Sequence, residues 1–391
     1  KGMRTRLNNF LIKRSVFLVG IAASSIVCAE DVDRLQLNAS VQSIWDSNFS
    51  RSPLNDSEQS VLSSVGFRFD DTFGRQRLIA KWDVHRYQYD EHPDFDATTD
   101  TGQLSLKGAL GSLFTTDVDF QRNAYQVDRL EFFGKDIVTR DDLNAKLGYG
   151  SDNRLSFHLG ARKSTQEHSN DARDSLDFEE REGFVDAGFQ TNNKSSIYFR
   201  YKSGKRTYTH SPVDIANPIS LVDLDFNYQQ LELDSRWALT AKTSISAFVA
   251  RYKRDGDIND ATGSLASIAG EWQATEKINV TGGYTLSEPA VGETSDSPSK
   301  VKTLSLNLLW QYSSKWSFGS RAAYSVVDYD KLPPEFVREE KAYNFSPLAV
   351  SFDSGHYWKF RVDSGWRKNE SSTYVRNYIS RQVNAGLYLS F

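Results

Sequence analysis

The sequence predicts an all-β fold, a transmembrane up-and-down antiparallel β-barrel of about 18 strands, within a range of roughly 16 to 20. Three observations predict it: apolar and polar residues alternate through most of the chain, short and long connections alternate, and the N-terminus has the pattern of a secretion signal. A hydrophobic content of 39% and a mean hydropathy of −0.54 would also fit a soluble protein of two or three domains. Only alternate strand residues face lipid in a barrel, so the residue pattern has to separate the two classes.

The N-terminal segment predicts export from the cytoplasm. Its basic residues are Arg4, Arg6, Lys13 and Arg14. An apolar stretch over 15–27 follows, and small residues precede Glu30. This order is typical of a signal peptide, and the apolar stretch is shorter than a membrane-spanning helix requires. We therefore expect a cleaved signal peptide over 1–29 and a single outer-membrane β-barrel domain over 30–391 of a Gram-negative bacterium.

Two other readings of this segment remain open, an N-terminal anchor helix and a lipoprotein whose first mature residue is Cys28. Val27 is a poor residue before a lipidated cysteine. Cys28 is the only cysteine, so its removal with the signal excludes disulfides, thiolate metal sites and a cysteine nucleophile. Loss of the basic leader also increases the acidic excess of the chain, which argues against nucleic acid as a partner.

Alternation with a period of two continues from residue 35 to the last residue, in segments of about ten residues. The first segment has apolar residues at Leu35, Leu37, Ala39 and Val41, with polar residues between them. The last has them at Val383, Ala385, Leu387, Leu389 and Phe391. A conservative count gives about eighteen such segments. A soluble, secreted multi-sheet protein is the alternative.

The connections between these segments alternate in length, as short periplasmic turns and long outer loops do in bacterial barrels. Short turns rich in Ser, Asp, Asn and Lys occur, for example, at 151–153, 191–194 and 313–315. The long segments are Tyr89–Asp100, Arg162–Asp177, Lys205–Val222, Ser287–Val301 and Asp328–Lys341. Proline cannot donate to a strand ladder, and eight of the nine prolines fall in proposed outer loops. Pro347 alone falls in a segment, where we expect a bulge or a strand start.

Two further features of the sequence are typical of outer-membrane barrels. Five tryptophans lie close to short turns, where a periplasmic aromatic girdle is expected: Trp237, Trp272, Trp310, Trp316 and Trp358. The chain ends on an apolar strand whose Gly386, Leu387, Leu389 and Phe391 resemble the C-terminal assembly signal of outer-membrane barrels. An unpaired apolar strand can be templated by edge pairing. We therefore expect outer-membrane lipids and the barrel assembly machinery as partners.

A barrel of this strand number encloses an aqueous lumen, so the polar phase of each strand faces water. The resulting lumen and substrate-path candidates are Lys81, Asp83, His85, Tyr87, Tyr89, Asp117, Asp119, Tyr198, Arg200, Lys202, Glu232, Asp234, Arg236, Lys359, Arg361 and Asp363. The charges are mixed in sign, which fits cross-strand pairs that stiffen the wall as well as contacts to a solute. The tyrosines, with Tyr125 and Tyr388, could stack on sugar rings or belong to the interface belts.

Catalysis has little support in the sequence. Asp83 and His85 lie two residues apart on one strand face and could neighbour a serine. No Gly-x-Ser-x-Gly elbow accompanies them, and no spacing typical of metal ligands occurs. We expect no enzyme activity, no catalytic residue, no metal and no cofactor.

A short motif follows the first predicted strand, Trp45-Asp46-Ser47-Asn48-Phe49-Ser50-Arg51-Ser52-Pro53. It resembles the aromatic-Asp-x-Asn-x-Phe-Arg-x-Pro opening of the β-barrel porin 2 family, and in particular its EpsL-like exopolysaccharide-biosynthesis outer-membrane barrels. Asp46, Asn48, Arg51 and Pro53 match in identity and spacing, whereas Ser50 stands where the family tends to have Phe. The resemblance implies export of a polysaccharide, with that polysaccharide and a periplasmic export protein as partners.

The motif also has a local interpretation. Asp46 and Asn48 can cap a turn, and Arg51 can pair with Asp46 or with a carboxylate of the lumen. We hypothesise that the motif folds the first outer loop inward as a constriction. Two functions stay open: a pore or machine component for exopolysaccharide export, and a general or small-solute porin or a closed barrel that serves as an assembly scaffold. We expect a monomer, because no trimer latch is recognisable.

Overall fold

The computed structural model describes residues 34–150, 154–210, 223–290, 299–329, 337–355 and 357–391. The chain divides into two compact units, Lys1–Arg34 and Leu35–Phe391. The first is almost entirely outside the described residues, as are the predicted signal peptide, its cleavage site and Cys28. The following account therefore concerns the second unit.

This unit consists almost entirely of strands. They are β1 Leu35–Asp46, β2 Glu58–Phe73, β3 Gln76–Tyr89, β4 Ala97–Leu110, β5 Phe114–Gln126, β6 Ile137–Tyr149, β7 Leu155–His168, β8 Phe178–Gln190, β9 Ser196–Tyr208, β10 Phe226–Thr240, β11 Thr243–Asp255, β12 Ala261–Thr275, β13 Ile278–Ser287, β14 Lys300–Gln311, β15 Trp316–Asp328, β16 Glu339–Asp353, β17 Trp358–Ser371 and β18 Tyr378–Ser390. Within the described ranges, three short 3₁₀ turns lie between strands: η2 Pro93–Phe95, η3 Asp171–Leu176 and η5 Tyr374–Arg376. No helix in the described part of the chain is long and apolar enough to cross a membrane.

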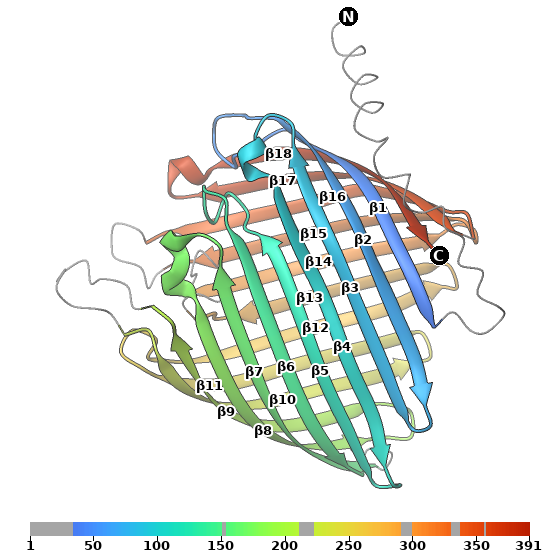
Figure 1. The fold of residues 1–391 in the computed structure, drawn as a ribbon. Helices are drawn as coiled ribbons and strands as arrows, with labels where there is room; N and C mark the ends of the chain where they lie inside the picture. The colour runs from blue at the N-terminus through green and yellow to red at the C-terminus, as the bar shows by residue number, and fades with distance from the viewer. Residues whose placement is uncertain (1–33, 151–153, 211–222, 291–298, 330–336, 356) are drawn as a thin grey trace, which may run out of the picture. The chain divides into compact units, whose positions relative to one another are not determined.

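The strands form one closed antiparallel sheet. Each strand pairs with its neighbours in the sequence, and β1 also pairs with β18, so that the 18-stranded sheet has no open edge (Figure 1). The closing register runs from Asn38 opposite Ser390 to Asp46 opposite Gln382. The last residue continues this pairing, because Phe391 exchanges backbone hydrogen bonds with Leu37 at 2.8 and 2.9 Å. The predicted barrel and its strand number are confirmed.

Turn and loop lengths alternate as predicted. The short turns include two residues between β10 and β11 and the glycines Gly74 and Gly111, whose φ angles of 65° and 67° lie in the left-handed region that glycine adopts without strain. The long loops gather at the other end of the barrel (Figure 1). They are shorter than predicted, because β7 continues to His168 and β9 to Tyr208. Backbone pairing does not require an apolar face, so the strands extend past the point where the apolar alternation stops.

Pro347 lies within β16 at the bulge expected for it. The β15–β16 register shifts between Gly319 and Arg321, and the β16–β17 register shifts between Phe345 and Ala349. The bulge leaves proline outside the regular ladder, where its missing N–H costs no hydrogen bond.

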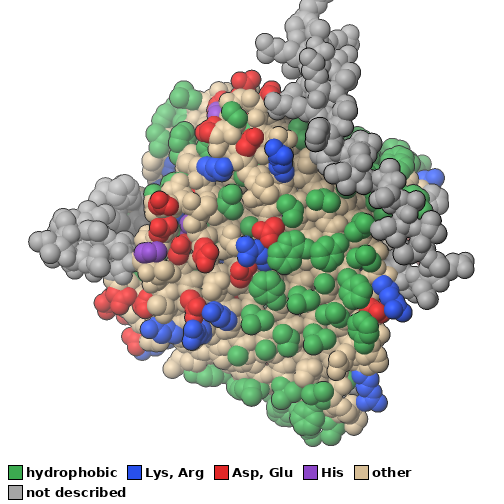
Figure 2. Space-filling view, viewed as in Figure 1, with side chains coloured by type: hydrophobic (Ala, Val, Ile, Leu, Met, Phe, Trp, Pro, Cys, Tyr) green, Lys and Arg blue, Asp and Glu red, His purple; other side chains and the backbone are tan. Residues whose placement is uncertain are grey.

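The outer surface carries the apolar phase of the strands. Leu159, Val185 and Leu231 are 60%, 50% and 46% exposed, although they lie in the middle of strands. Figure 2 shows such apolar side chains spread over the wall, with charged side chains gathered toward the outer-loop end. The five predicted girdle tryptophans are all exposed near short turns. Exposed apolar side chains on this scale are stable only against lipid, which makes the unit a transmembrane barrel.

Candidate functional site

The predicted lumen residues all lie in the phase opposite to the lipid-facing side chains, and we call this phase the inner wall. Three cavities along the inner wall, of about 680, 320 and 310 Å³, are lined by ten of them. These ten are Lys81, Asp83, His85, Tyr87, Asp119, Tyr198, Arg200, Lys202, Asp234 and Lys359. The structure distributes the candidates around the wall in separate groups and does not bring them to one centre.

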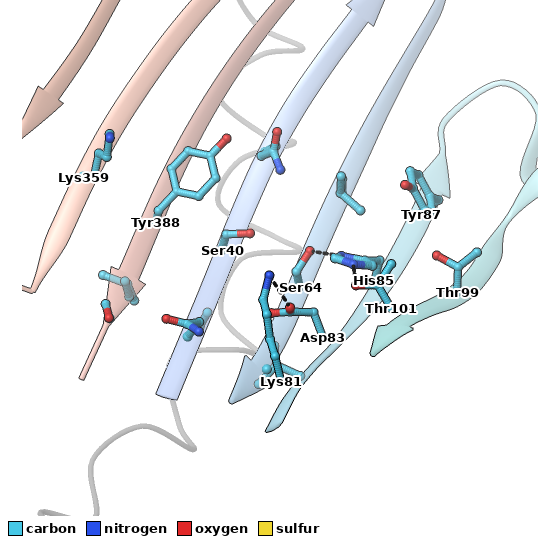
Figure 3. A pocket seen from close by; sticks show the side chains of 18 of the residues that line it. Ser40, Ser64, Lys81, Asp83, His85, Tyr87, Thr99, Thr101, Lys359 and Tyr388 are labelled. Atoms are coloured by element: carbon cyan, nitrogen blue, oxygen red, sulfur yellow. Dashed lines mark hydrogen bonds and ion pairs between the residues drawn. The ribbon is translucent and has the colours of Figure 1, made fainter. Parts of the chain in front are cut away.

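The largest cavity is formed by strands on both sides of the barrel closure, from β17 through β1 to β5 (Figure 3). His85 lines this cavity, and its Nδ1 lies 2.8 Å from the Ser64 hydroxyl and its Nε2 3.4 Å from the Thr101 hydroxyl. Tyr388 and Tyr87 stand on either side of this group. Hydroxyls, an imidazole and two phenol rings give the cavity hydrogen-bonding groups next to flat apolar faces, a combination that suits a polyhydroxylated solute.

The serine beside His85 does not form a catalytic triad. The Asp83 carboxylate lies 3.3 Å from the Lys81 ammonium on the same strand, and a threonine hydroxyl occupies the second imidazole nitrogen. A nucleophilic serine needs a base that a third, usually acidic, group orients. In the described residues no group of three or more His, Cys, Asp and Glu side chains is arranged to hold a metal ion either.

A second group of inner-wall residues, on β7 to β10, forms a continuous network of opposite charges. Arg200 contacts Asp186 at 3.0 Å and Glu232 at 3.4 Å, and Lys202 contacts Glu232 at 2.9 Å. Asp186 also accepts a hydrogen bond from His158. The carboxylates of Asp186 and Glu232 are nearly fully covered, at 1% and 6% exposure. Ion pairs that are shielded from solvent in this way restrain both the charged side chains and the strands that carry them.

Sequence reasoning found only part of this network. Arg200, Lys202 and Glu232 were among the candidates, whereas Asp186 and His158 were not. The sequence did contain an indication of Asp186, because Glu180, Glu182 and Asp186 all fall on the polar phase of β8.

The remaining lumen candidates lie outside this network. Asp117 is 3.8 Å from Lys107, Asp119 accepts hydrogen bonds from Gln103 and Gln121, and Arg361 is 3.3 Å from Asp363. Tyr89 lies at the outer end of β3, and Arg236 near the short-turn end of β10.

The motif that follows β1 is built into the outer mouth. Asp46, at the end of β1, accepts hydrogen bonds from the Asn48 backbone N–H at 2.9 Å, Ser380 at 2.6 Å and Gln382 at 2.7 Å. Asn48 is 1% exposed, and its amide donates to the carbonyls of Ser52 and Ile379. The motif thus ties the first outer loop to β18, the strand that closes the barrel.

Arg51 holds this arrangement together. Its Nη1 lies 2.7 Å from Asp46 and donates to the Asn48 carbonyl, and both charged side chains are buried. Its φ of 53° is unusual for a residue with a side chain and persists because these contacts fix it. Burial alone would lower the pKa of Arg51, but the carboxylates of Asp128 and Asp46 raise it above its usual value. Of the two predicted partners, the structure has Asp46, and it adds Asp128 at 3.6 Å.

Asp128 belongs to the loop between β5 and β6, which the sequence did not single out. This loop extends over the mouth as far as β17 and the turn that follows it, because Asp128 also lies 3.6 Å from Arg367 of β17 and the carbonyl of Leu130 accepts a hydrogen bond from Arg376 at 2.7 Å. Five strands separate β5 from β17 around the barrel. The loop therefore crosses part of the opening and does not stand above it.

An aromatic cluster fixes the same loop from the other side. The Arg129 guanidinium lies 4.1 Å from the ring centre of Phe49, 4.5 Å from that of Phe95 and 5.3 Å from that of Tyr89. The His92 ring stacks on Phe49 at 4.7 Å. Cations over aromatic faces are stabilised most where water is excluded. Phe49 is thus buried at the mouth, between the Arg129 guanidinium and the His92 ring.

The predicted assembly signal lies on the closing strand. Leu387 and Phe391 are exposed on the outer surface, at 38% and 50%, and the Phe391 ring stacks on Tyr357 at 5.9 Å. Gly386 lies on the inner wall, where a side chain would meet Gln42 at 2.9 Å. Recognition by an assembly machine remains a prediction.

Comparisons with known proteins give a fold but no family. No protein-family model matches the sequence, and no curated protein is similar to it. Three similar solved structures are OccK2 (OpdF) of Pseudomonas aeruginosa in complex with glucuronate (TM-score 0.52, 10% identity, 92% of this chain and 96% of that one), OpdK of P. aeruginosa with vanillate (0.51, 6%, 93% and 100%) and OccAB4 of Acinetobacter baumannii (0.50, 9%, 92% and 98%). The likeness spans the whole barrel and defines the class of the molecule, an 18-stranded outer-membrane-type β-barrel.

Proposed function

We propose that the chain is an outer-membrane pore, without enzyme activity, for small polar solutes. The observation that carries the proposal is the inner wall itself, which combines paired charges, hydroxyls and tyrosines around cavities of about 310 to 680 Å³. A closed barrel of this strand number leaves an interior that such side chains do not fill. The sequence expectation favoured exopolysaccharide export, and the alternative of a small-solute porin now has the better support.

Two considerations support a small solute over a polymer. The loops at 47–57 and 127–136 are tied across the outer mouth by the contacts of Arg51 with Asp128 and of Arg376 with the Leu130 carbonyl, which restricts the width available to a chain of sugars. Two of the similar solved structures were determined with small organic acids, glucuronate and vanillate. Mixed charges along the wall suit polar molecules of either sign, and the tyrosines beside His85 suit hydroxylated ones.

The test is reconstitution of the purified barrel in planar bilayers and liposomes. Discrete conductance steps, together with liposome swelling that falls off steeply with sugar size, are the expected results. A barrel that conducts no ions and admits no sugar would contradict the proposal and would leave the scaffold function. An Asp186→Asn or Lys202→Gln change that shifts ion selectivity would assign the current to the inner wall.

Export of an exopolysaccharide is the second candidate, and the match of Asp46, Asn48, Arg51 and Pro53 to the EpsL-like motif favours it. On this proposal the barrel works as a monomer, and a periplasmic export protein delivers the polysaccharide. A clean deletion, with polysaccharide measured separately in periplasm and medium, distinguishes the candidates. Loss from the medium that the gene restores in trans would establish export, and unchanged secretion would exclude it.

A further inference from the structure

A band of basic residues occupies the outer surface of β7 to β11, at the outer-loop end. Lys163 of β7 lies directly opposite Arg181 of β8, and Arg181 lies directly opposite Lys205 of β9. Arg251 and Lys253 of β11 continue the band. All five side chains are exposed and belong to the phase that faces outward. We call these five residues the basic band.

The basic band starts where the apolar surface stops. Toward the periplasm, the outward residues of the same strands are apolar and exposed, among them Leu159, Val185, Leu231 and Val249. Because the apolar surface contacts lipid tails, the basic band lies at the depth of the lipid headgroups of the outer leaflet.

The spacing of the cations requires an explanation. Like charges directly opposite one another on neighbouring strands destabilise a sheet. Among the described residues, the carboxylates within contact of the basic band are Glu179, at 2.9 Å from Lys163 and 2.6 Å from Arg181, and Asp225, at 3.6 Å from Lys205. Glu167 and Asp255 also face outward at this end of β7 and β11, so the five cations still outnumber these four carboxylates.

The outer-loop end of the opposite wall has a different arrangement. There, Lys302, Lys341 and Lys368 also face outward, but each has its own carboxylate: Asp328 at 3.4 Å, Glu339 at 3.4 Å and Glu370 at 2.5 Å. Charge at the headgroup depth is thus locally balanced on β14 to β17 and unbalanced on β7 to β11. The contrast indicates that the basic band meets a charge that the protein itself does not supply.

We propose that the basic band binds the phosphate groups of an anionic lipid in the outer leaflet. Arg181 and Lys205 would contact the phosphate oxygens. The Arg181 guanidinium can do so because Glu179 lies at its Nε and the side chain is otherwise exposed. The apolar outward residues on the periplasmic side of the basic band would contact the acyl chains. The same headgroup would relieve the repulsion along the row. This assignment depends on the orientation of the barrel in the membrane and is independent of what the pore conducts.

The test compares two triple variants of the full barrel by native mass spectrometry with diphosphoryl lipid A as the probe. The first, Lys163→Gln/Arg181→Gln/Lys205→Gln, removes the three cations that lie opposite one another on β7, β8 and β9, and we call it the row variant. The second, Lys302→Gln/Lys341→Gln/Lys368→Gln, removes three lysines that each have a carboxylate partner. Each basic residue near an anionic lipid surface contributes about fivefold to affinity, so the first variant should bind roughly 100-fold more weakly. The second should stay within about twofold of the unchanged protein.

Thermal unfolding in a neutral detergent gives a second readout, and it separates lipid binding from folding. Without lipid, the row variant should be at least as stable as the unchanged protein, because a repulsion has been removed. Added lipid A should raise the unfolding temperature of the unchanged protein but not that of the variant. If the triple variant does not fold, Arg181→Gln alone should lose about fivefold in affinity.

Equal loss of lipid binding in both triple variants would show that only total charge matters and would overturn the proposal. Retention of full affinity by the row variant would overturn it too. Inorganic phosphate that binds as tightly as the lipid would assign a free-anion site in its place. Single-channel conductance measured on the same samples keeps a failure of this proposal distinct from a failure of the proposed pore function.

Discussion

Arg51 offers the sharpest test of the outer mouth, since one side chain joins three segments of the chain. Its guanidinium contacts Asp46 at the end of β1, the carbonyl of Asn48 in the first loop, and Asp128 in the loop between β5 and β6. Replacing Arg51 with alanine removes all three contacts. It leaves the buried Asp46 carboxylate without its counter-charge.

The magnitude follows from these contacts. Removing one partner of a buried ion pair costs about 3 to 5 kcal/mol. Asp46 keeps its hydrogen bonds from Asn48, Ser380 and Gln382, so we expect the lower end, about 3 kcal/mol. That energy corresponds to a roughly 100-fold shift in the equilibrium between docked and undocked loop. The left-handed backbone at residue 51 loses the contacts that maintain it, which adds to the shift.

Single-channel recording in planar bilayers measures this shift. Arg51→Ala should visit a larger conductance level more often and for longer, and should show noisier open currents. Arg51→Lys keeps the charge but loses the planar guanidinium, so its conductance behaviour should fall between that of Arg51→Ala and that of the unchanged protein. Arg77→Ala is the matched control, because Arg77 pairs with Asp70 by two bonds of 2.8 Å but is exposed near the short turns. Currents of Arg51→Ala that match those of the unchanged protein, with unaltered unfolding, would refute the role given to the motif.

Three further predictions concern the wall. Asp186→Asn should destabilise the barrel by about 2 kcal/mol, because the Arg200 guanidinium loses its nearer carboxylate at 3.0 Å and keeps only Glu232 at 3.4 Å; an unchanged midpoint of urea unfolding would contradict this reasoning. Gly102→Val should cost about 1 to 3 kcal/mol, since a Cβ there would lie 2.4 Å from the Trp82 ring; Gly183→Val, where the Cβ meets open space, is its control in the same unfolding assay. Tyr388→Ala should weaken block of the ion current by an added sugar up to about tenfold if the largest cavity binds sugars through ring stacking, and unchanged block would exclude that use of the cavity.

The sequence by itself determined the fold. Residues such as Leu35, Leu37 and Val41 alternate with polar neighbours, and a strand with that pattern has to place one face in lipid and the other in water. The positions of the prolines and the tryptophans agreed with this pattern, because each depends only on the local backbone or on the depth in the membrane. The same alternation assigned Lys81, His85 and Arg200 to the inner wall before any contact was known.

Only the tertiary structure decided which residues meet. Asp128 and Arg51 are far apart in the sequence, and the loop that brings them together has no periodicity to reveal it. The pairing of Arg200 with Asp186, and the hydroxyl of Ser64 beside His85, depend on the register of neighbouring strands. A shift of one residue would turn each of these side chains to the other face of the sheet. Alternation fixes the face on which a residue lies, whereas register and loop packing fix its partners, and those exist only once the barrel has closed.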